Sequence, residues 1–147
     1  YRDEYNQMLG DKRGDFRVML VHEWLPQALS ATAAQEQGGE SWYLFGHCTE
    51  VTALPASTKQ WADIFARFGA KLENVNVGCC GMAGTYGHEV KNHANSLAIY
   101  ALSWQQAMQR LPRNRCLVTG YSCRSQVKRI EGSGVRHPLQ ALLEIMG

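Results

Sequence analysis

Residues 41–48, Ser-Trp-Tyr-Leu-Phe-Gly-His-Cys, give the clearest strand signal in the chain and end in a thiol. Aromatic and aliphatic residues dominate positions 41–46, which is typical of a β-strand. A helix ending at Gly69 is predicted next, because Ser57 and Gln60 have the spacing of a capping box and apolar residues follow at helical spacing. The residues predicted to be buried on this helix are Trp61, Ile64, Phe65 and Phe68.

The same alternation of strand and helix signals continues on both sides of this segment. Compact apolar runs predict further strands at residues 16–22, 75–77 and 116–119. Residues 23–40 predict a weak helix followed by a glycine-containing loop. Helical periodicity predicts three later helices: one from 88–95 to Pro112, one over 122–130, and a last one with Leu139, Leu142, Leu143 and Met146 on one face. This order predicts an α/β fold, a mostly parallel sheet of about four strands with helices on both faces.

The composition indicates a globular domain. Of the 147 residues 45% are hydrophobic and 19% are charged, which favours a folded core over disorder. We expect residues 16–147 to form one domain, and residues 1–15 to be an N-terminal extension or the remnant of an upstream domain. The net charge of +2 is too small to indicate nucleic-acid binding, and no apolar run approaches the roughly 20 residues that span a bilayer. The polar start predicts no signal peptide, and the missing initiator Met is expected of a fragment of a longer protein.

The five cysteines are expected to serve metal or redox chemistry. An odd number suits a disulfide framework poorly, so we expect a reducing, cytoplasmic compartment. Cys79 and Cys80 are adjacent, and Gly81 follows them. Neighbours on an extended strand point to opposite faces, whereas a glycine-rich bend can aim both sulfurs into one pocket. The pair therefore predicts ligands for a soft metal.

Four of the thiols are predicted to converge at one edge of the sheet. Cys48 follows the second predicted strand, Cys79 and Cys80 follow the third, and Cys123 follows the fourth. Ligands of open parallel sheets bind beyond the carboxyl ends of the strands. Helix N-termini and exposed loop N–H groups also favour thiolates and hydrogen-bond to cluster sulfides.

Neighbouring residues allow both a structural and a functional interpretation. Cys116 begins a predicted strand and is expected to be a small buried apolar residue. His47 and His88 lie near the predicted edge, where each is either a polar wall residue or an auxiliary ligand. Three spaced glycines indicate either a phosphate-binding loop or a loop that folds tightly around the cysteines. They are Gly81, Gly84 and Gly87.

The run Cys79-Cys-Gly-Met-Ala-Gly-Thr-Tyr-Gly-His-Glu89 resembles the signature of the cysteine-rich "CCG" domain. That domain occurs in heterodisulfide reductases, in the anchor-type subunit of anaerobic glycerol-3-phosphate dehydrogenase, and at the C-terminal end of FAD-linked 2-hydroxyacid dehydrogenases. Residues 119–126, Thr-Gly-Tyr-Ser-Cys-Arg-Ser-Gln, and 137–143, His-Pro-Leu-Gln-Ala-Leu-Leu, are most similar to the last group. The resemblance covers residues 16–147.

This resemblance implies an electron-transfer module within a larger bacterial D-2-hydroxyglutarate or D-lactate dehydrogenase-type flavoenzyme. The parent would oxidise a CH–OH group with FAD and pass electrons through iron–sulfur centres to a quinone or another carrier. Its flavin and ferredoxin-type domains would lie upstream, and the location would be cytoplasmic or peripheral to the inner face of the membrane. The fragment alone would carry no catalytic residue.

The family further implies which residues hold the cluster. Its iron–sulfur ligands would be Cys48, Cys79, Cys80 and Cys123. The family's last element is often Cys-x-x-Cys, and Gly120 stands where its first cysteine would be. Four thiolates suffice for one ordinary [4Fe–4S] cluster.

Two other functions remain open from the sequence. Four cysteines also suit a structural zinc ion. Alternatively, the domain has no cluster and serves thiol–disulfide chemistry or the docking of subunits and domains.

Overall fold

The computed structural model describes residues 2–32, 39 and 41–147, which divide into two compact units at Thr32. The predicted boundary after residue 15 falls within the first unit. This unit contains the helices α1 (Arg2–Leu9), η1 (Gly10–Arg13) and α2 (Val21–Ala28). The loop predicted at the end of residues 23–40 lies largely outside the described residues.

The strand predicted at residues 16–22 is wrong. Residues 16–20 have no regular structure, and α2 begins at Val21. The carboxylate of Glu23 accepts a 2.8 Å hydrogen bond from the backbone N–H of Leu20, which supports a helix start here. Phe16 is 44% exposed and packs edge-on against Tyr5 of α1. Within the described residues, the apolar run therefore makes a contact inside the first unit and pairs with no strand.

The second unit is built on a parallel sheet, as predicted, although the described residues form three strands rather than about four. The strands are β1 (Ser41–Phe45), β2 (Lys71–Asn74) and β3 (Cys116–Val118), in the order β2-β1-β3. The strand predicted at residues 75–77 is misplaced, because β2 covers the four residues immediately before them. Only Leu72 of β2 is buried, so the pairing of this strand rests mainly on backbone hydrogen bonds to β1.

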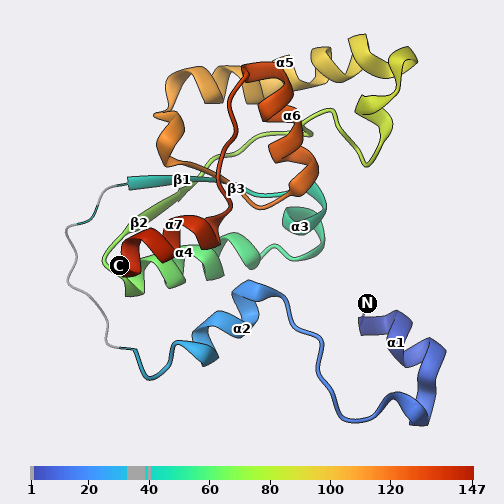
Figure 1. Cartoon of the computed structure of the whole chain (residues 1–147), viewed down its shortest axis with the longest axis vertical. Coiled ribbons are helices and arrows are strands. Elements are labelled where there is room, and N and C mark those ends of the chain that lie inside the picture. The colour runs from blue at the N-terminus through green and yellow to red at the C-terminus, as the bar shows by residue number, and fades with distance from the viewer. Residues whose placement is uncertain (1, 33–38, 40) are drawn as a thin grey trace. The chain divides into compact units, whose positions relative to one another are not determined.

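Helices cover both faces of this sheet, as predicted (Figure 1). On one face, Trp42 of β1 packs against Phe65 of α4 (Ser57–Arg67). On the other, Phe45 packs against Trp104 of α5 (His93–Arg110), with ring centroids 5.1 Å apart. Figure 1 shows α5 and α6 (Tyr121–Glu131) on one side of the strands, and α4 and α7 (Pro138–Met146) on the other. The remaining helices of this unit are α3 (Cys48–Ala53), η2 (Tyr86–His88), η3 (Val90–Asn92) and η4 (Arg113–Arg115).

The boundaries of α4 are predicted correctly, but its cap is not. Ala56 occupies the N-cap without a side-chain hydrogen bond, and Ser57 is the first helical residue. The hydroxyl of Ser57 is buried and has no hydrogen-bond partner among the described residues. Gly69, with φ of +73°, ends the segment in the left-handed conformation that glycine tolerates.

The strand order places the loops that matter for function. β1 runs into α3 through Gly46 and His47, and β3 runs into α6 through Thr119 and Gly120. These two strands are neighbours, while the chain between them passes through β2 at the far side of β1. Such a reversal of strand order opens a crevice at the carboxyl edge of a sheet.

Candidate functional site at the carboxyl edge of the sheet

The four predicted thiols lie in segments at the carboxyl edge of the sheet. Cys48 is the first residue of α3, the adjacent pair lies in the loop after β2, and Cys123 lies in the first turn of α6. Electrostatic interactions link the thiol of Cys79 to those of Cys80 and Cys48. Cys80 interacts in the same way with Cys123. The four thiols therefore interact in the sequence Cys48, Cys79, Cys80 and Cys123, and are called the thiol row below.

This thiol row has a buried half and an exposed half. Cys80 and Cys123 are 3% and 1% exposed and belong to the core beneath α5 and α6. Cys48 and Cys79 are exposed and line a cavity of about 210 Å³ together with residues 74–78. The row thus runs from the surface into the domain core.

The surroundings of Cys80 favour its thiolate form. Interaction with the Cys123 thiol, together with backbone N–H groups, lowers the pKa of Cys80 to about 7. The same interaction, together with burial, raises the pKa of Cys123. Burial also raises the pKa of Cys79, against the effect of the Gly81 N–H, which lies 3.3 Å from its sulfur. The protein therefore already stabilises negative charge on sulfur at the inner end of the row.

Glycine is required at two points of the loop that carries the cysteine pair. Gly81 has φ of +84°, and a Cβ there would lie 2.2 Å from the backbone oxygen of Ser96. At Gly87 a Cβ would lie 2.7 Å from the Ser96 hydroxyl. Gly84 also has positive φ, but the space around it is open. These contacts show a loop folded tightly against α5, while a role of the glycines in cofactor binding stays a prediction.

Of the two histidines, only His47 lies at the thiol row. Its backbone N–H donates to the Thr119 hydroxyl at 2.9 Å, and its Nε2 lies 3.5 Å from Ser122 Oγ. Ser122 in turn interacts with the thiol of its neighbour Cys123. His88 is exposed in η2, and no hydrogen bond joins its side chain to these groups in the described part of the chain.

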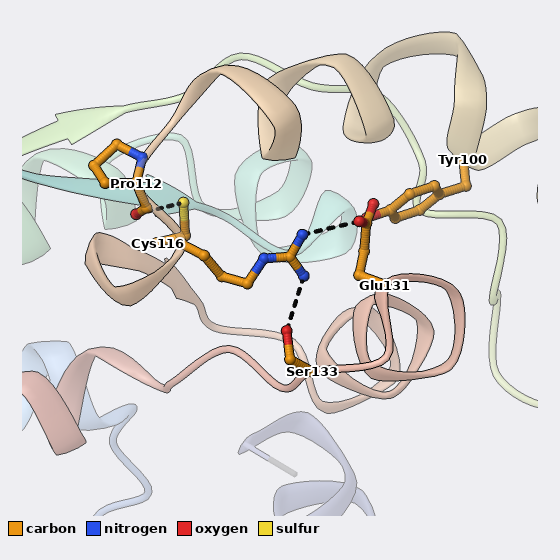
Figure 2. Close-up of polar contacts among 6 residues, drawn as sticks. Tyr100, Pro112, Cys116, Glu131 and Ser133 are labelled. Atoms are coloured by element: carbon orange, nitrogen blue, oxygen red, sulfur yellow. Dashed lines mark hydrogen bonds and ion pairs between the residues drawn. The ribbon is translucent and has the colours of Figure 1, made fainter.

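Cys116 lies at the opposite, amino end of β3 (Figure 2). Its thiol donates to the carbonyl oxygen of Pro112 at 3.5 Å, and burial raises its pKa to about 11. It is 1% exposed, as expected of a small core residue. Within the residues that the structure describes, no three His, Cys, Asp or Glu side chains are grouped to hold a single metal ion.

Sequence reasoning missed the polar residues that hold the site. Ser96 and Gln126 are fully buried behind Gly81, and Arg129 reaches the carbonyl oxygen of Gly87. Thr119 and Glu50 hydrogen-bond to each other at the start of the crevice. The sequence offered one signal for them, because several lie within six residues of Cys123.

Comparison with known proteins identifies a larger protein that contains a similar segment. The chain is 74% identical over 146 residues to the D-2-hydroxyglutarate dehydrogenase of Escherichia coli (strain K12). The match covers 99% of this chain but 14% of that protein. The chain is similar to one short segment of a long dehydrogenase. D-2-hydroxyglutarate dehydrogenases of Haemophilus influenzae and Pseudomonas putida show 51% and 46% identity, over 15% and 14% of their lengths.

No protein-family model matches the chain, and no solved structure matches it. The CCG signature therefore stays a resemblance.

Proposed function

We propose that this chain is the iron–sulfur electron-transfer module of a larger FAD-dependent D-2-hydroxyglutarate dehydrogenase. The observation that carries the proposal is the placement of four thiols at the carboxyl edge of one sheet, where they interact in sequence: Cys48, Cys79, Cys80 and Cys123. The relatives are D-2-hydroxyglutarate dehydrogenases, which supports D-2-hydroxyglutarate over other 2-hydroxyacids as the parent's substrate.

The donor chemistry of the row fits an iron–sulfur cluster. Each thiolate of such a cluster binds a different iron, so the four sulfurs surround the cluster and need not meet at a single ion. A bound cluster would supply one-electron transfer, with a potential set by burial and by hydrogen bonds to sulfur. The Gly81 N–H already donates to the sulfur of Cys79 at 3.3 Å. The buried half of the row would keep water from one side of the site.

The proposed partners rest on the resemblance to the CCG domain. It implies upstream flavin and ferredoxin-type domains and a quinone or similar carrier that accepts the electrons. The chain spans about a seventh of the length of its relatives, which leaves room for such domains. We place the module in the cytoplasm or at the inner face of the membrane, where its free thiols remain reduced. None of the described helices is long and apolar enough to cross a bilayer.

Metal and sulfide analysis of the intact protein, purified without oxygen, tests the proposal. We expect about four irons and four sulfides bound at this site, with broad visible absorbance. Cys79→Ala and Cys123→Ala should abolish this binding. Cys116→Ala is the matched control, because it removes an equally buried thiol away from the row, and it should retain the iron.

Two other results would replace the proposal. Zinc without sulfide, lost in the same variants, would identify a structural zinc site. A folded protein with no metal, whose variants still pass electrons from the flavin to the acceptor, would leave a docking role.

A further inference from the structure

Gly120 is confined by a histidine from another loop. A Cβ at this position would lie 2.4 Å from Cδ2 and 3.0 Å from Cγ of His47, and 3.0 Å from Sγ of Cys123. The backbone of Gly120 has φ of −75° and ψ of 130°, a conformation open to any residue. The absence of a side chain here is therefore dictated by the His47 ring and the Cys123 sulfur, and not by the backbone.

The main chain on either side of that ring is fixed. The backbone N–H of His47 donates to the hydroxyl of Thr119, and that hydroxyl donates to the carboxylate of Glu50. The N–H of Thr119 donates to the carbonyl oxygen of Phe45. These bonds join the carboxyl ends of β1 and β3, so the backbone from which the imidazole projects toward Gly120 is held in place.

A polar path leads from the ring to the buried thiols. Nε2 of His47 lies 3.5 Å from the Ser122 hydroxyl, and Ser122 also interacts with the thiol of its neighbour Cys123. Cys123 interacts in turn with Cys80. The imidazole and the Cys123 sulfur thus border the same side-chain space at Gly120 and have Ser122 as a common neighbour.

We propose that His47 is a positioning residue of the thiol row, whose ring fills the side-chain space of Gly120 and holds Cys123 against Cys80. His47 and Gly120 form a complementary pair, because the large side chain of His47 on one loop lies beside a residue without a side chain on the other. The importance of this pair for a bound cluster rests on the proposed function, whereas its effect on Cys123 does not.

The pair can be tested in the intact protein without its metal. Cys123 is 1% exposed, and its rate of alkylation by iodoacetamide, followed by peptide mass spectrometry, reports how firmly it is held. His47→Ala opens space beside the sulfur and Gly120→Ala pushes the ring away, so each should raise this rate at least tenfold. In the double variant the new methyl occupies space vacated by the ring, so its rate should be lower than that of Gly120→Ala.

Matched controls come from the same chain. Gly134→Ala adds a methyl at a glycine with open space around it, and His88→Ala removes an exposed ring. Neither should change the alkylation rate of Cys123. Unchanged rates in His47→Ala and Gly120→Ala, or a double variant whose effect is the product of the single effects, would overturn the pairing.

The iron-loaded protein gives a separate readout. His47→Ala should shift the midpoint potential or the electron paramagnetic resonance spectrum of the centre, which a change confined to stability would leave in place. If wild-type protein contains no iron and sulfide, the proposed function is wrong. The alkylation result is unaffected by this outcome, because it is measured without metal. A loaded His47→Ala protein with an unaltered potential and spectrum would overturn the positioning role at the cluster.

Discussion

The hydroxyl of Ser96 donates a hydrogen bond of 2.8 Å to the carbonyl oxygen of Gly81, immediately behind the cysteine pair. Gln126 of α6 donates to the same hydroxyl at 2.9 Å, and Arg129 donates to the carbonyl oxygen of Gly87. Two turns of the cysteine loop are therefore tied to two different helices. These groups are buried or half-buried. Removing the partner of one of them therefore costs more free energy of unfolding than removing the partner of an exposed group.

Ser96→Ala should destabilise the protein by about 1–3 kcal/mol, because it leaves the buried carbonyl of Gly81 without its donor. The variant also removes one acceptor from the Gln126 amide. Urea unfolding followed by circular dichroism measures the loss. Gln109→Ala, at an exposed position of the same helix, should stay within about 0.5 kcal/mol of wild type. Equal effects of the two variants would show that the buried hydroxyl does not hold the loop.

Gly81→Ala and Gly84→Ala should differ sharply, although both glycines have positive φ. At Gly84 a methyl meets nothing within 4 Å, so the cost is the backbone strain alone, about 1–2 kcal/mol. At Gly81 the methyl would also lie 2.2 Å from a backbone oxygen of α5, which cannot turn aside. We expect Gly81→Ala to displace the cysteine loop and abolish metal loading, and Gly84→Ala to keep both.

Thermal unfolding and metal analysis check this pair together. Similar losses of stability in the two variants would contradict the close approach of Gly81 to Ser96.

The sequence predicted those elements whose burial pattern is strong. β1, β3, α4 and α6 carry apolar residues at the spacing of a strand or a helix, and the structure contains each of them. β2 was misplaced because it buries only Leu72 and is held through backbone pairing, which leaves almost no apolar pattern. The strand at 16–22 was wrongly predicted because a short apolar run does not distinguish a strand from irregular chain leading into a helix.

The edge of the sheet at which the thiol-bearing segments lie could be predicted, whereas the side chains that pack around them could not. The order of strands and helices is enough to bring the loops after parallel strands to one edge. The contacts of Ser96 with Gly81 and of His47 with Gly120 depend instead on how side chains pack between loops far apart in the sequence. The buried face predicted for α7 is partly wrong for the same reason. The helix buries Ala141, whereas Leu143, predicted to lie on the apolar face, is 72% exposed.

Glu131→Gln should weaken a half-buried polar cluster at the C-terminal end of α6 (Figure 2). The carboxylate accepts a 2.8 Å bond from Arg113 and a 3.0 Å bond from Tyr100, and its side chain is 15% exposed. The amide keeps the shape but loses the charge, so we expect a loss of about 1–2 kcal/mol in urea unfolding. Asp63→Asn in the exposed pair with Lys59 is the control and should cost less than about 0.5 kcal/mol. Equal costs would mean that Glu131 is solvated like a surface residue.

Cys116→Val should make the protein less sensitive to alkaline pH. Burial raises the pKa of Cys116 to about 11, whereas the thiol of an unfolded chain titrates near about 8.5. Between these values the unfolded chain gives up the thiol proton and the folded protein keeps it, so stability falls as pH rises. Above pH 11 both forms are deprotonated and the loss levels off. Valine has no proton to lose, so its variant should avoid this part of the decline.

The measurement is the difference in unfolding free energy between wild type and Cys116→Val, taken at pH 7 and at pH 11. Other groups that titrate in this range cancel in the difference. At pH 7 the variant should lie within about 1.5 kcal/mol of wild type, because valine is apolar and similar in size. By pH 11 the difference should move in favour of the variant by about 2–3 kcal/mol, the free energy of a shift of roughly two pKa units. A constant difference would mean that the thiol is solvated in the folded protein, and a loss of bound metal in this variant would place Cys116 at the metal site.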